Sequence, residues 1–181
     1  MGITQKFTPE VMLAAPRRGA AVPNHDGTLA LYTVSTYDFV EGKQTKELKV
    51  TDIKEGTSHV LSSDDNIVEA LWLPRRSEVV CLVKGDKGGT RLVVTDAAQS
   101  VGEGRVIADF DGALTGMKVK RLDDDSIVFA AAGLVGDDGK LFNEEKEKKR
   151  GTARVFDTSR VWVVSSRLDT VMVSNGRGPC Y

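Results

Sequence analysis

The sequence predicts an all-β fold, a partial β-propeller of about three four-stranded antiparallel blades, on three observations. Two segments, "LKVTDI" at 48–53 and "LVVTDA" at 92–97, share four residues in the same order, 44 positions apart. Apolar runs centred near Tyr32, Cys81 and Phe129 recur at intervals of 49 and 48 residues. Helical patterns are confined to "TPEVMLAA" and "NEEKEKKR". A period of about 40 to 50 residues built from four strands is typical of propeller blades.

The first predicted blade begins with a short apolar run, Ala20 to Val22, that ends at Pro23. Asp26-Gly27 then supplies a turn that favours positive φ, and the run Leu29 to Val34 is expected to form the second strand. The first copy of the repeated segment forms the third strand. "TSHVL" follows a polar turn and is expected to be the fourth.

The second and third blades repeat this order. In the second, "EALWLP" precedes a polar turn, Val79 to Val83 form the inner apolar strand, and "GRVIADF" is expected as the fourth strand after a glycine-rich bend. In the third, Asp123 to Ser126 make the turn and Ile127 to Ala131 form the apolar strand. The repeated segments are therefore interpreted as the third strands of successive blades.

These elements predict a lead segment at 1–18, blades near 19–64, 65–112 and 113–158, and an atypical tail at 159–181 for which disorder is one expectation. "TARVFDTS", after a charged insertion, resembles the missing third strand of the last blade. A β-sandwich, whose strands also recur with regular turns, remains the alternative fold. Closed propellers need about four to eight blades. We therefore expect a piece of a larger propeller, or one completed by another chain.

Composition and charge exclude several classes of partner. The 25 basic and 26 acidic residues are mixed along most of the chain and give a net charge of -1, so no basic surface for nucleic acid or anionic lipid is expected. No stretch approaches the ~20 apolar residues of a membrane helix, and the first ten residues lack the pattern of a secretory signal. As written, the chain is expected in the cytosol, with no nucleic-acid or membrane partner.

The opening stretch "FTPEVMLAAPRRGAAVPNHDGTLALYTVSTYDF", followed by "KELKVTDI", "ALWLP" and "ARVFD", resembles the N-terminal propeller of fungal dipeptidyl-peptidase V. That family consists of serine peptidases of the prolyl oligopeptidase type. The resemblance covers residues from about Phe7 to Asp157. It implies a two-domain hydrolase, in which an α/β-hydrolase domain with a Ser, Asp and His triad releases dipeptides from peptide N-termini. Secreted members of the family begin with a signal peptide.

The sequence departs from this family at its end. Members run to several hundred residues, whereas here "TSRVWVVSSRLDTVMVSNGRGPCY" follows "ARVFD" and fits no blade. The resemblance therefore implies a non-catalytic propeller fragment of a serine protease. Peptide substrate is then expected only in the context of a full-length enzyme.

Candidates for hydrolytic chemistry are few. A hydrolase serine sits in a Gly-x-Ser-x-Gly turn, and no such pentapeptide occurs. Ser174 in "VSNGRG" is interpreted as the nearest approach, but it lacks the preceding glycine. A triad also needs a histidine base. His25 and His59 are the two available, and both are expected to be structural or exposed, so no catalytic residue is assigned.

No metal or cofactor site is predicted. Two distant histidines and two isolated cysteines cannot supply a zinc site. The run Asp123 to Asp125 lacks the spacing of a calcium loop and is expected to be a solvated turn. Gly102-x-Gly104 breaks the nucleotide-binding pattern at once. The charged run Glu144 to Arg150 is interpreted as a flexible insertion, with a localisation signal in its last three residues as the alternative.

Four remaining residues are expected to have structural roles or receive none. Trp72 is expected in the core, with an exposed site at the propeller mouth as the alternative, and Trp162 receives no role. Cys81 lies in the apolar run "EVVCLV" and is expected to be buried. Cys180 is expected to be exposed, and a bridge between the two cysteines is the minor alternative.

Two functions follow from these expectations. The first is the fragment of a dipeptidyl-peptidase described above. The second is a free-standing interaction module, which completes itself by self-association or with a partner through its open strand edges.

Overall fold

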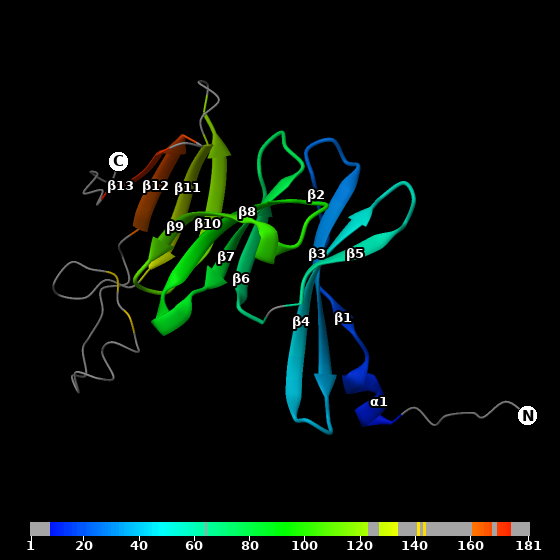
Figure 1. Ribbon diagram of the computed structural model, residues 1–181. Coiled ribbons are helices and arrows are strands. Elements are labelled where there is room, and N and C mark those ends of the chain that lie inside the picture. Colours follow the sequence, from blue (N-terminus) through cyan, green and yellow to red (C-terminus); the bar gives the residue numbers. More distant parts are fainter. Residues whose placement is uncertain are drawn as a thin grey trace, which may run out of the picture. The chain divides into compact units, whose positions relative to one another are not determined.

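A computed structural model describes residues 8–63, 65–122, 127–133, 141, 143, 161–167 and 170–174, the last two ranges by their backbone. The chain forms two compact units, Met1–Asp65 and Asn66–Tyr181, which are described separately. Within the described ranges, the α-helix α1 and two short 3-10 helices accompany thirteen strands arranged in three sheets (Figure 1). The expected all-β class is therefore confirmed.

The first unit contains α1 (Pro9–Ala14) and five strands: β1 (Arg17–Arg18), β2 (Val22–Pro23), β3 (Leu29–Asp38), β4 (Lys43–Asp52) and β5 (Ser58–Ser62). α1 lies within the predicted segment "TPEVMLAA". Its N-cap is Thr8, whose hydroxyl accepts a hydrogen bond from the backbone N–H of Val11 at 3.4 Å. The helix therefore begins where its threonine satisfies a free backbone donor.

The first strand of this sheet is split in two. The strand order is β1-β3-β4-β5, and β2 pairs with a second stretch of β3. β1 places Arg17 opposite Ser35, whereas β2 places Pro23 opposite Ala30. Proline lacks the N–H that a central strand needs, and β2 lies beside β3 only, where this is tolerated. The sheet thus has five strands instead of the four expected, because residues 19–21 leave the strand and separate β1 from β2.

The turn between β2 and β3 follows the predicted chemistry. Asp26 accepts a hydrogen bond from the backbone N–H of Thr28 at 2.9 Å, and Gly27 has a φ of +73°. β3 and β4 then pair without interruption from Leu29↔Asp52 to Asp38↔Lys43. The resulting long hairpin of β3 and β4 projects from the rest of the first unit (Figure 1).

The second unit begins with a four-stranded sheet of order β6-β7-β8-β9. Its strands are β6 (Ile67–Trp72), β7 (Glu78–Lys84), β8 (Thr90–Asp96) and β9 (Arg105–Phe110). The 3-10 turns η1 (Asp86–Gly88) and η2 (Val101–Glu103) lie between its last three strands. Adjacent strands pair antiparallel, as expected for one blade.

The repeated segments occupy the same place in their sheets. The first ends β4 and the second ends β8, each the third main strand. Asp52 accepts hydrogen bonds from the backbone N–H groups of Lys54 and Glu55 at 2.9 and 2.8 Å. Asp96 accepts one from Ala98 at 2.8 Å. Each repeated segment therefore ends a strand on an aspartate whose carboxylate closes the following turn.

The third sheet has the order β10-β11-β12-β13. Its strands are β10 (Leu114–Arg121), β11 (Ile127–Gly133), β12 (Val161–Arg167) and β13 (Thr170–Ser174). Thus the range 159–181, expected as a tail that fits no blade, contributes backbone pairing to β11, with Ile127 opposite Ser166. "TARVFDTS", at 152–159, lies outside the described residues. The predicted domain boundaries remain predictions.

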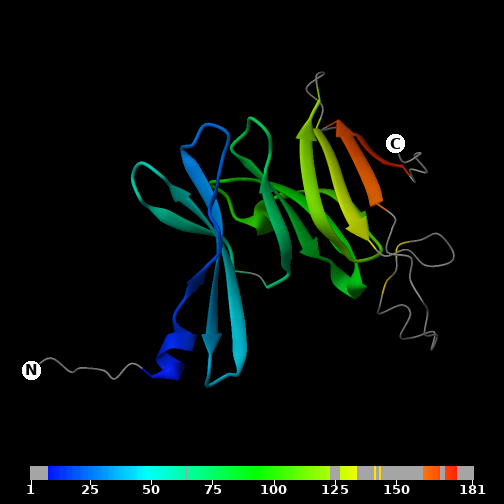
Figure 2. The same cartoon turned by 180° about the vertical axis from the view of Figure 1, so that it is seen from behind.

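The two sheets of the second unit share one hydrophobic core. Its buried members come from both sheets and are Leu73, Val80, Leu82, Leu92, Val94, Leu114, Met117, Ile127, Phe129 and Ala131. β10 lies beside β6, so the first strands of the two sheets are neighbours. Figure 2 shows the sheets stacked side by side from behind. This is the packing of neighbouring blades.

Glu69 joins these first strands by its side chain. One carboxylate oxygen accepts a hydrogen bond from the backbone N–H of Gly116, and the other accepts one from that of Met117, each at 2.6 Å. Gly116 has a φ of +66°, within a register shift of β10 between Thr115 and Lys118. The carboxylate thus satisfies two backbone donors that the irregular strand turns toward it.

Candidate functional site

The residues weighed for hydrolytic chemistry lie apart from any catalytic geometry. His25 is exposed in the turn between β2 and β3, and His59 is exposed in β5 opposite Val50. Ser174 is the last residue of β13, and the residues that follow it lie outside the described ranges. The structure therefore places neither histidine beside a serine that a turn presents as a hydrolase nucleophile.

Asp26, the carboxylate beside His25, is engaged by the turn. Its Oδ1 accepts hydrogen bonds from the backbone N–H of Thr28 and from the Thr28 hydroxyl, the latter at 2.6 Å. The bond from the Thr28 hydroxyl has the largest effect and, with the bond from the Thr28 N–H, lowers the pKa of Asp26. The nearby His25 imidazole lowers it further. The carboxylate stabilises the turn instead of orienting a general base.

Ser58 is a closer approach to the hydrolase pentapeptide than Ser174, and sequence reasoning missed it. It follows Gly56 and Thr57, but Val60 stands where the second glycine is required. Gly56 has a φ of +71° in the turn before β5, which accounts for that glycine. The Ser58 hydroxyl bonds to Tyr32, whose O–H donates at 3.2 Å, and to Thr51. It belongs to a hydroxyl network on the sheet surface.

Cys81 is buried in the middle of β7, as predicted. Burial raises the pKa of its thiol from 9.0 to about 12. At neutral pH the group is therefore a thiol, which is neither a nucleophile nor a metal ligand. It serves as a small hydrophobic residue, and Cys180 lies outside the described residues.

The other predicted positions have structural explanations where they are described. Trp72 is half-buried at the end of β6, opposite Val79. A side chain at Gly104 would lie 2.6 Å from Val93, so close packing requires this glycine. The structure does not describe three other features named in the sequence: the run Asp123 to Asp125, the charged run Glu144 to Arg150, and the side chain of Trp162. Within the described ranges, no three His, Cys, Asp or Glu side chains form a group that could hold a metal ion.

A polar pocket of about 330 Å³ lies beside the β7–β8 hairpin. Arg91 donates to Asp109 at 3.1 Å and to Asp86 at 3.3 Å. The buried Asn143 amide donates to the backbone carbonyl groups of Lys87 at 2.7 Å and Asp111 at 2.5 Å. These bonds connect the hairpin to the segment after β9. The guanidinium already has two carboxylate partners, so the pocket is a structural junction.

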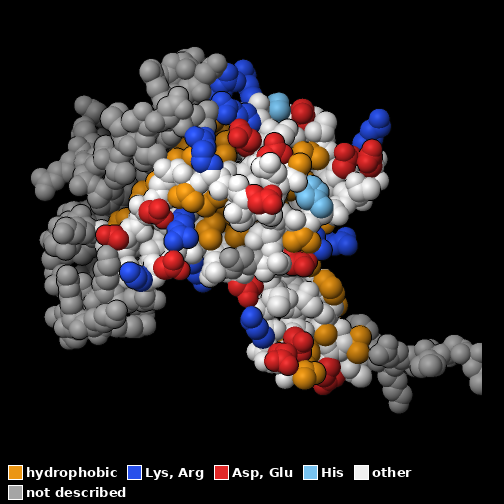
Figure 3. Space-filling model, in the orientation of Figure 1, with side chains coloured by type: hydrophobic (Ala, Val, Ile, Leu, Met, Phe, Trp, Pro, Cys, Tyr) orange, Lys and Arg blue, Asp and Glu red, His pale blue; other side chains and the backbone are white. Residues whose placement is uncertain are grey.

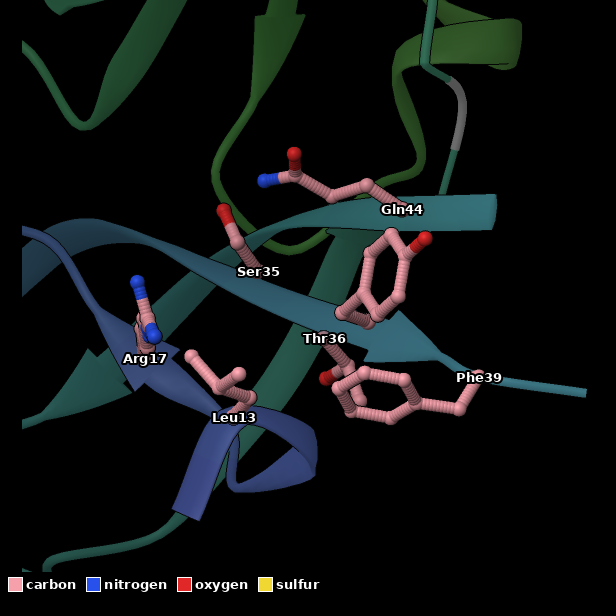
Figure 4. A pocket seen from close by; sticks show the side chains of 7 residues that line it. Leu13, Arg17, Ser35, Thr36, Phe39 and Gln44 are labelled. Atoms are coloured by element: carbon pink, nitrogen blue, oxygen red, sulfur yellow. The ribbon is translucent and has the colours of Figure 1, made fainter. Parts of the chain in front are cut away.

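A second groove, of about 380 Å³, belongs wholly to the first unit. Leu13 of α1, Arg17 of β1 and Phe39 of the β3–β4 turn line it from three elements (Figure 4). Its remaining lining residues are Ser35, Thr36, Tyr37 and Gln44. The Tyr37 and Phe39 rings meet edge to face, with centroids 4.8 Å apart. The groove can bind an amphipathic surface, because it combines apolar walls with a cation and neutral hydrogen-bonding groups.

Comparison with known proteins relates the chain to peptidases. A probable dipeptidyl-peptidase 5 of Aspergillus clavatus is 32% identical over 169 residues, which is 91% of this chain and 23% of the relative. The dipeptidyl-peptidase 5 of Trichophyton equinum is 33% identical over 155 residues, or 84% and 21% of the two chains. Both relatives are dipeptidyl-peptidases by name. The chain thus spans less than a quarter of the length of these relatives.

The family resemblance drawn from the sequence is supported by these names. No protein-family model matches the chain. Among solved structures, an oligogalacturonate lyase in complex with manganese is 14% identical with a TM-score of 0.46, covering 86% of this chain and 40% of that one. In the part of the chain that the structure describes, no helix has the length and hydrophobicity to cross a membrane.

Proposed function

We propose that the chain is a non-catalytic propeller portion of a dipeptidyl-peptidase 5-like serine peptidase. The observation that carries this proposal is the match of 91% of the chain to only 23% of a relative of that name. The blade-like sheets, with a core shared between two of them, fit a propeller portion. In this proposal the propeller admits peptides to a hydrolase domain, which releases dipeptides from their N-termini.

The expected lack of activity rests on the placement of the hydrolytic candidates. The sequence contains no Gly-x-Ser-x-Gly segment. Ser58, the nearest approach to it, begins β5 within a network of hydroxyl groups. A serine in such a strand lacks the sharp turn and the base that acyl transfer requires.

The direct test is an assay of the purified chain with a chromogenic dipeptide substrate, beside a full-length dipeptidyl-peptidase 5. We expect release of the chromophore by the full-length enzyme and none by this chain. Turnover that follows the chain through purification, and that is lost when Ser58 is replaced by alanine, would overturn the proposal.

A second test reads the genomic DNA and transcripts downstream of the codon for Asp157. The proposal expects an open frame that encodes more blades and a Gly-x-Ser-x-Gly segment. A gene in which neither transcript nor downstream DNA encodes such a segment contradicts it.

The alternative function is a free-standing interaction module, and the groove of the first unit favours it. The groove presents Leu13, Tyr37 and Phe39 at exposures of 39%, 38% and 44%. Exposed apolar residues gathered at one place mark contact surfaces more often than chance positions do. In this alternative a partner or a second copy binds through such a surface, whereas the first proposal requires no such contact.

A further inference from the structure

One end of the first unit exposes an unusual set of apolar side chains, which we call the hairpin patch. Its members are Val11, Met12, Leu13, Tyr37, Phe39 and Val40, with exposures from 38% to 93%. α1 has no buried residue, although half of its six residues are Val, Met and Leu. A helix with this composition normally packs its apolar side chains against another surface.

Three members of the patch lie together, and the other three are their neighbours along the chain. Leu13, Tyr37 and Phe39 line the same groove, and the two aromatic rings are in contact. Val40, the most exposed member at 93%, follows Phe39 directly in the turn. Figure 3 shows hydrophobic side chains beside acidic ones on the part of the first unit that contains this hairpin and α1.

The patch carries charges of both signs at its borders. Arg17 and Arg18 are exposed in β1, and Arg17 lines the groove. Glu41 is exposed at the tip of the hairpin, beside Asp38, whose carboxylate closes the turn by accepting from the backbone of Val40 at 2.8 Å. Within the described ranges, neither arginine side chain nor the Glu41 carboxylate takes part in an ion pair.

We propose that the hairpin patch is the interface of a two-fold dimer, in which it packs against the same patch of a second copy of this chain. A two-fold axis brings identical surfaces together and exchanges their ends. The basic end of one patch, at Arg17 and Arg18, then meets the acidic end of the other, at Glu41. The surface is therefore complementary in charge to itself.

The size of the patch fits this arrangement. Its six residues have areas of roughly 150–250 Å² each and are on average about half exposed, which gives roughly 500 Å². This is the size of the largest apolar patch on a typical monomer, about 300–600 Å², and such a patch is often functional. Two such patches in contact bury about 1,000 Å², the lower bound for a biological interface, so we expect a weak, reversible dimer. The groove between Leu13 and Phe39 receives an apolar side chain of the second copy.

Sedimentation velocity of the full chain over a wide range of concentrations tests the proposal. We expect reversible association to a species of twice the 19.6 kDa mass of the chain. Phe39→Ser is expected to raise the dissociation constant at least about tenfold, as for a residue at an interface centre. The matched control is Val106→Ser, at an apolar residue that is 49% exposed in the second unit, and it is expected to leave the constant unchanged.

Charge reversal provides a test that does not depend on the apolar core. Arg17→Glu and Glu41→Arg are each expected to weaken the dimer several-fold, and the double variant to restore it, because the exchanged charges meet again across the axis. Both positions are exposed, so the variants are expected to fold. A chain that stays monomeric at all concentrations overturns the proposal, as does a dimer that neither Phe39→Ser nor charge reversal weakens.

Discussion

The carboxylate of Glu69 offers the sharpest test of how neighbouring sheets are joined in the second unit. Replacing Glu69 by alanine removes the acceptor for two backbone N–H groups. The N–H of Gly116 lies at an exposed position, where water can replace the lost acceptor, so the cost there is only about 0.5 kcal/mol. The N–H of Met117 is partly buried and loses a charged acceptor, which costs about 1.5–2 kcal/mol. The expected loss of unfolding free energy is therefore about 2 kcal/mol.

Urea unfolding, followed by circular dichroism, measures this loss as a shift of the midpoint at constant slope. Glu69→Gln keeps an oxygen acceptor but no charge, and it is expected to cost about half as much. The control is Glu103→Ala in the same unit, at an exposed carboxylate that makes no hydrogen bond or ion pair with the described residues. The reasoning is refuted if Glu69→Ala destabilises the protein no more than Glu103→Ala does.

Three further predictions concern the backbone, the core and the buried thiol. Gly116→Ala is expected to lower the free energy of unfolding by about 1 kcal/mol in urea, because φ is +66° there, although an added Cβ would meet no atom within 4 Å. The control Gly102→Ala, at a glycine without a positive φ, is expected to cost less, and equal costs would contradict the conformational argument. Leu82→Ala, at a residue 1% exposed in the shared core, is expected to cost about 2–5 kcal/mol by the same assay, and a cost below 1 would place it outside the core. In a Cys180→Ser background, Cys81 is expected to react with a thiol reagent at pH 8 only as fast as the protein opens, since its pKa of about 12 leaves almost no thiolate; prompt reaction of the native protein would disprove its burial.

The strand order could be predicted from the sequence because local chemistry determines it. Strand β7 falls on the run Val79 to Val83, and β11 begins at Ile127 as expected. The repeated Thr-Asp at the end of β4 and β8 reflects a turn that the aspartate closes through its own carboxylate. Each of these features depends on residues within a few positions of one another.

Features that depend on distant residues escaped prediction. Glu69 meets Gly116 across 47 positions, and no local pattern shows that one carboxylate will satisfy two donors of another sheet. In the sequence, Glu69 has the pattern of an ordinary polar residue in a strand. Likewise, the groove forms only when α1 and β1 pack beside the end of β3, which brings Leu13 next to Phe39. These contacts are properties of the tertiary packing.

The tail shows a different limit. The segment "VWVVSSR" at 161–167 has the β-branched residues typical of a strand, yet the family resemblance predicts no blade strand there. The structure pairs its backbone with β11. Strand propensity alone was thus a better guide to this backbone than the resemblance to the family.

The central claim is that successive four-stranded sheets pack face to face as propeller blades with a common core. Nuclear Overhauser effects in the methyl-labelled protein test this most directly, between the Phe129 ring or the Leu114 methyl groups in one sheet and the methyl groups of Val80, Leu82 and Leu92 in the other. The account predicts cross-peaks that join the two sheets, because all five side chains belong to one buried cluster. Cross-peaks confined to each sheet, with none between them, would contradict it.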